Sequence, residues 1–390
     1  MAIGILKSNT LVAVVEEVTE GVFVPVAAGS DFIEVLEDGM ELSDAKELVE
    51  RNILTPSIGN VAPRTSTKSV TGSFPVEWKA GGVEGAVPDY DVLLRSLLGP
   101  VLALATFTTD SVGTVNTLVA TGHGAAVGDF LVIETAGEFH LAFVKVVTDA
   151  DNLTFTPDAP NTIQSGVDIS SSQKYAPVND GQITFSSSVY WGDEILETAL
   201  GCRANSMALE GFTTGQIPNL AFAFEGLDFD RVDGSAAFTP EFAPGLPPIV
   251  LGATLSVDGG SCVQLNDVTL SVEHTLAFLT TVCSLSGKIA SRYSDRIITG
   301  TFNPYLDDTT TEFFDKFQAD TLFEMTITLG IPSAVTGELI PGSNVGIYLP
   351  SVLITETPIS DLEGLLINSI SFNANTGVSG GNVEIFMGFS

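Results

Sequence analysis

The sequence predicts a mainly β protein, and three observations carry this prediction. Apolar and polar residues alternate in short segments along the whole chain, which is the pattern of half-buried strands. Glycine, at 38 of 390 residues, bounds these segments together with Asp, Asn and Pro, as tight turns require. The third observation is a repeat, because residues 70–75 read VTGSFP and residues 298–304 read ITGTFNP. We therefore expect a fold built from two β units.

Length and charge restrict the class of protein. A chain of 390 residues exceeds the usual size of one core, so two or three domains are expected. Its 48 acidic and 15 basic residues give a net charge of −33, yet 44% of the residues are hydrophobic, so the chain is acidic and folded. Proteins that hold nucleic acid cluster Lys and Arg. The nearest such group, Lys288, Arg292 and Arg296, is predicted to be a solvated strand face.

The cysteines and apolar stretches indicate a reduced, soluble protein. Cys202, Cys262 and Cys283 are odd in number and match no zinc or disulfide framework, so buried thiols are expected. The N-terminus has no signal-peptide pattern, and the longest apolar stretches are too short to span a bilayer. We expect synthesis in the cytosol and no membrane partner.

The strands are predicted from period-two patterns. Residues 10–15 and 21–26 are predicted to form a hairpin around a turn at 16–20, and residues 206–209 are expected to pair with 220–224. The further strands expected are 268–272, 296–302, 323–329, 352–355 and 366–372. Trp78 and Trp191 lie in strand contexts and are expected to be core or interface anchors.

Two helices are predicted, each after one copy of the repeat. The first presents one apolar face, follows Pro88 and Asp89, and ends at Gly99. Its apolar residues are Tyr90, Leu93, Leu94, Leu97 and Leu98. The second carries Phe313, Phe314 and Phe317, and Thr309 with Glu312 has capping-box spacing before them. A third segment, residues 43–51, is ambiguous, because Ser43 and Asp44 suit a cap but apolar residues are few.

The order strand, helix, strand pair occurs twice and predicts an internal duplication. The first copy is expected to be discontinuous, with residues 1–104 and 173–241. An inserted β domain at 105–172 separates its parts, with strands near 114–120, 129–134, 138–148 and 153–157. A Pro-rich linker at 242–248 then leads to the second copy at 249–390.

No catalytic, cofactor or metal site is predicted. His123, His140 and His274 have no histidine partner at ligand spacing and are expected to be surface or strand residues. Residues 377–381 (GVSGG) match the nucleophile-elbow pattern around Ser379, but no histidine follows residue 274, so a hairpin turn is expected. Asp228, Asp230, Asp233 and Gly234 resemble a cation loop. Thr239 stands where a calcium loop needs glutamate, so an acidic turn is expected, with an opportunistic calcium site left open.

The chain resembles the major tail (tail tube) proteins of bacteriophages with long, non-contractile tails. The residues that carry the resemblance are Glu16 with Glu17 and Gly21, then segments 70–74, 91–98, 201–206 and 298–302. The resemblance covers most of the chain except the inserted domain, and it lies in the order of elements more than in invariant residues.

The resemblance implies β-sandwich or half-barrel units, each flanked by a helix, that form rings with a continuous inner β-barrel. Stacked rings make the tube through which DNA and the tape-measure protein pass, and tail terminator and tail-tip proteins close its ends. Some relatives carry fused pairs of units and form trimeric, pseudo-hexameric rings, which the repeat favours here over hexamers. The protein would be a virion tail component assembled in the host cytoplasm. Its negative charge would then keep DNA from adhering to the lumen.

Other classes remain open. A bacterial surface or S-layer-type protein would also be built from β domains, although no secretion signal is seen. A phage decoration or baseplate protein would share the composition. A hydrolase that uses Ser379 would be labelled by a fluorophosphonate, and we expect no labelling.

Overall fold

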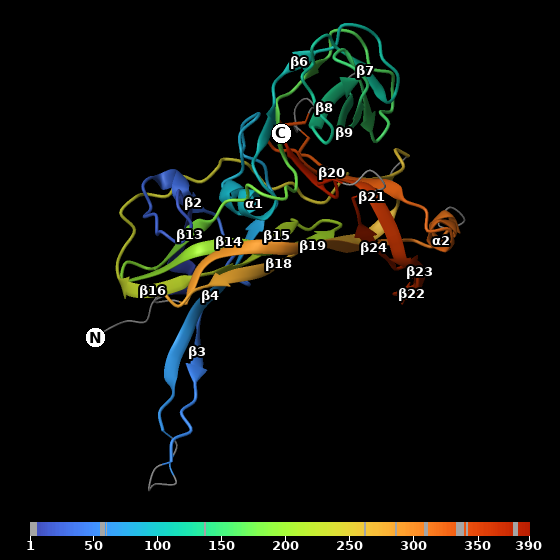
Figure 1. The fold of residues 1–390 in the computed structure, drawn as a ribbon. Coiled ribbons are helices and arrows are strands. Elements are labelled where there is room, and N and C mark those ends of the chain that lie inside the picture. Colours follow the sequence, from blue (N-terminus) through green and yellow to red (C-terminus); the bar gives the residue numbers. More distant parts are fainter. Residues whose placement is uncertain are drawn as a thin grey trace.

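The computed structural model describes residues 6–54, 59, 61–135, 138–260, 263–284, 287–307, 311–332, 339–340, 342–376 and 381–390. The fold is mainly β, as predicted, with α-helices α1 and α2 in these residues. Figure 1 shows a twisted sheet with α1 on one side, a small β region beyond it, and a long hairpin that projects from the opposite side. Strands from both halves of the sequence lie side by side in this sheet.

The first strand set surrounds the long strand β14. It consists of β1 (Thr10–Glu16), β3 (Glu41–Val49), β4 (Arg64–Glu77), β13 (Phe185–Trp191), β14 (Ile195–Thr213), β15 (Asn219–Gly226) and β16 (Asp228–Asp233). The N-terminal half of β14 pairs with β13 and β16, and its C-terminal half pairs with β15. β1 follows β13, while β4 and then β3 follow β15. All these pairs are antiparallel.

The second strand set surrounds β21 and repeats this pairing. It consists of β17 (Thr254–Val257), β18 (Leu265–Thr280), β19 (Lys288–Pro304), β20 (Phe323–Leu329), β21 (Val345–Glu356), β24 (Ile370–Ala374) and β25 (Phe386–Phe389). The N-terminal half of β21 pairs with β20 and β25, and its C-terminal half pairs with β24. β17 follows β20, while β19 and then β18 follow β24. Each strand therefore has a counterpart in the first set.

The repeated glycine explains why the sequence pattern occurs twice. Gly72 on β4 lies opposite Phe224, and Gly300 on β19 lies opposite Phe372. A Cβ atom would lie 2.2 Å from Phe224 Cζ in the first case and 2.5 Å from Phe372 Cζ in the second. Each glycine therefore leaves room for a phenylalanine ring of the neighbouring strand.

Register shifts also recur at matched positions. One lies between Ala204 and Ser206 of β14, and its counterpart lies between Ile354 and Glu356 of β21. A bulge bends a strand and increases its twist. The two long strands thus bend at the same place relative to their partners.

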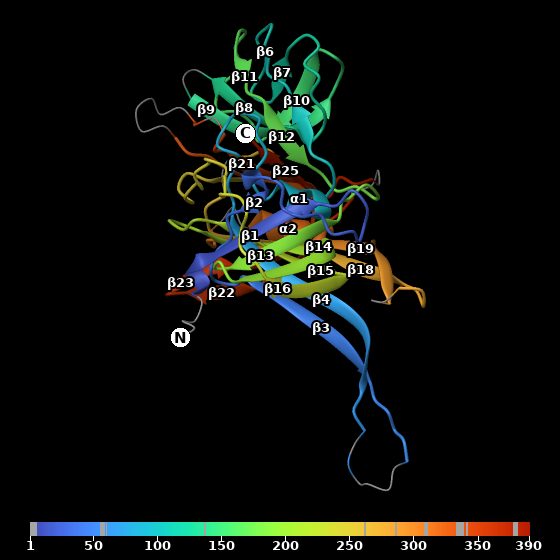
Figure 2. The same cartoon turned by 90° about the vertical axis from the view of Figure 1, so that its left-hand side faces the viewer.

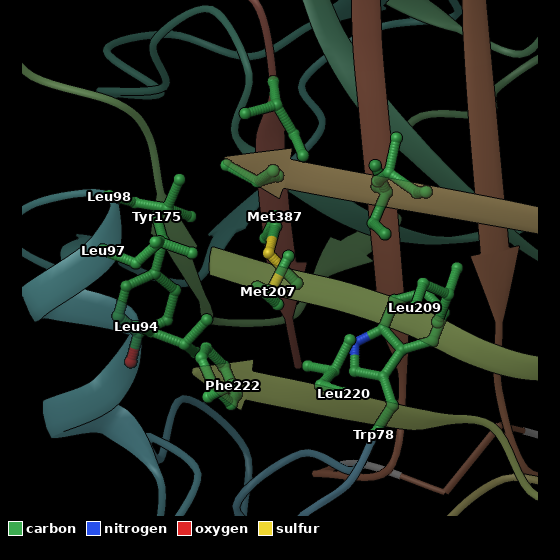
Figure 3. Close-up of a cluster of buried hydrophobic side chains, with 14 of the residues drawn as sticks. Trp78, Leu94, Leu97, Leu98, Tyr175, Met207, Leu209, Leu220, Phe222 and Met387 are labelled. Atoms are coloured by element: carbon green, nitrogen blue, oxygen red, sulfur yellow. The ribbon is translucent and has the colours of Figure 1, made fainter. Parts of the chain in front are cut away.

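The two sets share one sheet and one core. β14 pairs with β18, which joins the first set to the second. The largest cluster of buried hydrophobic residues draws on both sets. Figure 3 shows Leu94 and Leu97 of α1 near Met207 and Phe222 of the first set and Met387 of the second. The halves are therefore packed as one body along this sheet.

The two helices occupy the same place in the order but pack differently. α1 (Asp91–Leu97) lies as predicted, and the five residues of the predicted apolar face, Tyr90, Leu93, Leu94, Leu97 and Leu98, are fully buried. α2 (Thr311–Gln318) buries Phe313 against Phe302, with ring centroids 5.3 Å apart. Phe314 is 47% exposed, so the predicted apolar face is only partly used. Thr309, the predicted cap, lies outside the described residues.

A small β region lies between α1 and β13 in the sequence. Its four-stranded sheet contains β7 (Thr117–Val119), β10 (Asn152–Thr156), β9 (Glu138–Val147) and β8 (Phe130–Thr135) in that order, and β6 (Phe107–Thr108) pairs with β11 (Asp168–Ile169). It has a hydrophobic cluster of its own. The flanking strands β5 (Leu102–Leu104) and β12 (Ser172–Tyr175) pair with each other, and β12 also pairs with β25. The stem of this region therefore extends the second set.

Two strand predictions are wrong in detail, and the ambiguous segment at residues 43–51 is a strand for most of its length. Residues 21–26 form no strand, and β1 pairs with β13 and with β2 (Phe32–Ile33) instead. The reason is Glu17, whose buried carboxylate accepts hydrogen bonds from the Gly21 and Gly201 N–H groups and from two hydroxyls. Residues 43–51, considered above as a helix, belong mostly to strand β3, because pairing with β4 overrides the local preference for a helix. Residues 366–372 divide between β23 (Leu365–Asn368), which pairs with β22 (Ile359–Leu362), and β24. Short 3₁₀ turns occur at Lys7–Asn9 and Gly29–Asp31.

Candidate assembly surfaces

The histidines are not gathered into a catalytic site. His123 is buried in a turn, and its Nδ1 accepts a hydrogen bond from the Ala125 N–H at 2.9 Å. His140 lies in β9, with Nε2 2.8 Å from the Pro157 carbonyl oxygen. His274 lies inside β18, with its ring centroid 4.3 Å from that of Tyr293. Burial, reinforced by the Arg296 charge, lowers the pKa of His274 to about 4, so its ring is neutral at neutral pH.

The acidic segment near residue 230 is a strand. Asp228, Asp230 and Asp233 lie on β16, paired with β14, and not in the predicted turn. Asp228 accepts a hydrogen bond from Lys68 Nζ at 3.3 Å. Alternation along the strand places Asp233 on the face opposite to Asp228 and Asp230, whereas a cation loop would gather all three side chains. In the part of the chain that the structure describes, no three His, Cys, Asp or Glu side chains are placed to hold a metal ion.

The remaining candidates give a mixed result. Ser379, of the elbow-like pattern, and Cys262 lie outside the described residues. Cys202 is buried as predicted, and burial raises the pKa of its thiol well above the usual range. Cys283 is exposed, contrary to the prediction. Trp78 is fully buried, whereas Trp191 is half-buried.

The basic group on β19 is not a solvated face. Arg296 forms a part-buried ion pair with Glu384 at 2.7 Å, and Lys288 Nζ lies 4.0 Å from the Phe278 ring centroid. Only Arg292 is exposed, and it binds Glu20 at 2.6 Å.

The β18–β19 hairpin, called the inner arm below, is attached to the first set. Besides Arg292, the N–H of Ser291 donates to Glu20 at 2.5 Å. Burial opposes the charge of Glu20, but these two partners and Arg203 outweigh it, so the pKa of this carboxyl lies below its ordinary value. The Tyr293 hydroxyl donates to the Ser96 carbonyl of α1 at 2.7 Å. The sequence did not reveal these two contacts, because the partners in each are about 200 to 270 residues apart.

The sheet has a polar face turned away from the core, and the charged residues on it are acidic. Strand alternation places the following side chains there: Glu41 and Ser43; Thr71, Ser73 and Glu77; Ser206, Ala208 and Glu210; Asn219, Ala221 and Ala223; Asp267, Thr269, Ser271 and Glu273; Thr299, Thr301 and Asn303; Ser371 and Asn373. No Lys or Arg stands at these positions. Arg203, just before the register shift in β14, is buried and lies 3.6 Å from Glu20.

The polar face is hollowed where the two sets meet. The groove there has a volume of about 620 Å³. Its lining includes Glu210, Thr269, Thr301 and Asn373. Leu209, Leu270 and Phe372 also border the groove, and its lining contains no Lys or Arg.

These features define a β-rich structural protein whose two strand sets form one curled sheet. A family model described as "Phage tail tube protein" matches residues 7–378, so the chain belongs to the phage tail tube family. The resemblance seen in the sequence is confirmed, and the family gives the chain a structural role in the tail of a phage particle. No curated protein matches the sequence. Among the described residues, no helix combines the length and apolar character that a membrane crossing needs.

Proposed function

We propose that three copies of this chain close into one ring of the tail tube of a long, non-contractile phage tail. Stacked rings form a conduit for genome DNA and house the tape-measure protein, while tail terminator and tail-tip proteins bind the ends. The subunit is assembled in the host cytoplasm and performs no catalysis. In this reading, two tube units per chain make a pseudo-hexameric ring.

The matched strand sets support the division into units. The first unit comprises residues 1–104 and 173–241, and the second comprises residues 249–390 after a linker at 242–248. Matching pairings, register shifts and Gly–Phe contacts support two copies of one plan. Residues 105–172 form the inserted domain, with its own hydrophobic cluster.

The acidic polar face is the observation that carries the proposed conduit. A tube that passes DNA needs a wall that does not bind phosphate, and like charge repels a polyanion. Glu210 and Glu273 lie on this face on the two strands that join the sets. We infer that the polar face lines the lumen.

End-on electron microscopy of the purified, assembled protein tests the proposal. We expect rings with three outer protrusions, one inserted domain per chain, that stack into tubes. Six protrusions would exclude the trimer, and planar lattices would favour a surface-layer protein. A neutral or basic lumen in the assembled structure would contradict the role of the polar face.

The lumen charge has a separate test in DNA retention. Tubes of the variant Glu210→Lys with Glu273→Lys should retain DNA in a salt-dependent manner, while wild-type tubes should not. The matched control is Asp193→Lys with Glu194→Lys, two exposed positions in the turn between β13 and β14, outside the polar face. Equal DNA retention by both variants would show that the polar face does not meet DNA.

A further inference from the structure

Two strand edges lack a partner in the described part of the chain. β3 pairs with β4 on one side only, and β22, which continues from β21, pairs with β23 on one side only. The other side of β23 is occupied, since Ile367 bridges to Tyr305 and the Leu306 N–H donates to the Leu366 carbonyl at 2.9 Å. An unpaired edge presents free N–H and C=O groups and is a template for another strand. Figure 1 and Figure 2 show the β3–β4 hairpin, called the outer arm below, projecting from the body.

The same two edges are joined inside the chain in their other copy. β3 corresponds to β18, because Leu42 lies opposite Gly72 just as Leu270 lies opposite Gly300. β21 with β22 corresponds to β14, because the β21–β24 pair has the same register shift as the β14–β15 pair. β18 and β14 are paired with each other, and Glu273 lies opposite Ser206. The pairing of β14 with β18 is called the filled seam below. The corresponding strands β21–β22 and β3 are not paired with each other within the chain, so each has an open edge.

The correspondence gives a register for a second seam, in which these two open edges pair. Ala204 corresponds to Ile354, because each lies opposite the phenylalanine that covers a glycine. Ser206 then corresponds to Glu356, and Glu273 corresponds to Ala45. A seam that copies the filled one sets Ala45 opposite Glu356.

At residues 357–359 of the open edge, the backbone is oriented to form hydrogen bonds with a strand of another copy. The Ser369 N–H donates to the Pro358 carbonyl at 2.8 Å, so Pro358 faces its own hairpin. Backbone groups alternate in direction along a strand, so those of Thr357 and Ile359 face outward. The proline, which has no N–H, therefore removes no donor from the open edge. Thr357 and Ile359 correspond to Met207 and Leu209, which lie opposite Val272 and Leu270 in the filled seam.

The side chains near the open edge are also incompletely covered. Ile359 is 60% exposed and Leu365 is 59% exposed at the outer end of this hairpin. In the filled seam, the corresponding Leu209 is 1% exposed. A second strand along the open edge would cover apolar surface that is now in solvent.

We propose that β3 of one copy pairs antiparallel with β21–β22 of the next copy, with Ala45 opposite Glu356. The partner is thus a second copy of this chain, and the seam repeats β14–β18 around the ring. This inference rests on the proposed ring, and it adds which edges meet and in which register. The outer arm then lies along the neighbour as the inner arm lies along the first set.

A disulfide trap tests the register. In a background with Cys262→Ser and Cys283→Ser, the variant Ala45→Cys with Glu356→Cys places two thiols on the same face of adjacent strands. Assembled tubes treated with oxidised glutathione should give covalent dimers and trimers on a non-reducing gel. We expect at least ten-fold more product than from Ala45→Cys with Thr357→Cys, whose one-residue slip points the second thiol to the opposite face.

Two further measurements keep the outcomes separate. Ser206→Cys with Glu273→Cys should form a disulfide within one chain, which establishes that the matched seam geometry permits the bond. A reconstruction of wild-type rings should show β3 bonded to β21–β22 of the next copy, even if the cysteine variants fail to assemble. Rings joined through other edges, or equal trapping in both registers, would overturn the inference and leave the ring intact. The absence of any ring or tube would overturn the proposed function itself.

Discussion

The two strand sets have the same pairing but different covers. Over the first set, the N-terminal segment packs Phe32 against Tyr190, with ring centroids 6.0 Å apart. Over the second set, the inserted region packs Phe143 against Tyr348, with centroids 5.6 Å apart. The bare backbone at Gly346 is part of this contact, because a Cβ there would lie 2.9 Å from the Phe143 ring.

The comparison teaches that strand pairing and outer cover are specified separately. The pairing depends on short local features such as a glycine under a phenylalanine ring, and these features recur. The cover depends on material from elsewhere in the chain, and it differs between the sets. Glu324 of β20 illustrates this, since it accepts hydrogen bonds from Lys145 and Thr156 of the inserted region at 2.9 and 3.1 Å. The inserted region is therefore part of the second set's packing and also has a hydrophobic cluster of its own.

The largest effect is expected where the inserted region contacts the second set. Phe143→Ala removes a fully buried ring that packs on Phe130 and Tyr348, so the free energy of unfolding should fall by about 3–5 kcal/mol. Denaturant unfolding measures this loss, and limited proteolysis should show earlier cleavage in residues 105–172. The control is Val146→Ala on the same strand, where the side chain is 48% exposed. Equal losses in the two variants would mean that the contact contributes little.

The helices provide the next test of the comparison. Leu97→Ala in α1 removes a fully buried side chain and should cost about 2–5 kcal/mol. Phe314→Ala in α2 removes a side chain that is 47% exposed, and the expected loss is below about 1 kcal/mol. Thermal unfolding of both variants measures the difference. A larger loss for Phe314→Ala would show that α2 is covered in solution, for example by another subunit.

The two arms should differ in their response to pH. His274 on the inner arm is buried, whereas the corresponding Lys46 on the outer arm is exposed. The folded pKa of His274 is about 4 and the unfolded value is about 6.5, so the unfolded chain binds more protons between these values. This contribution to stability is fully present above pH 6.5 and is lost as the pH falls toward 4, by about 3 kcal/mol in all.

Substitution of the histidine tests this sign. His274→Phe keeps a ring beside Tyr293 and should flatten the fall in the unfolding free energy between pH 6.5 and pH 4.5. Thr275→Ala, at an exposed neighbouring position, should keep the wild-type slope. If both variants show the wild-type slope, other groups cause the acid sensitivity.

The sequence predicted the parts of this fold that depend on neighbouring residues. The helix at Tyr90–Leu98 and strand β20 follow from local periodicity, and the repeat at Gly72 and Gly300 pointed to the paired sets. Contacts over long separations were not predictable, since nothing local to Glu17 shows that Gly201 will bind it. The acidic face was present in the sequence as alternation, but assigning it required the register between strands.

The two glycines distinguish the strand sets most finely. Gly72→Ala and Gly300→Ala should each cost about 1–3 kcal/mol, because each new methyl group meets a phenylalanine ring. At Gly72 the three nearest atoms all belong to the Phe224 ring, whereas at Gly300 the Thr269 carbonyl oxygen also lies within 2.5 Å. Pairing Gly72→Ala with Phe224→Leu should therefore recover stability relative to the sum of the single changes. Pairing Gly300→Ala with Phe372→Leu should recover less, because a backbone oxygen does not give way. Double-mutant cycles from urea unfolding measure both coupling energies. Equal recovery would mean that β18 shifts to accept the methyl group, and the two sets would then be alike in their tolerance as well as in their pairing.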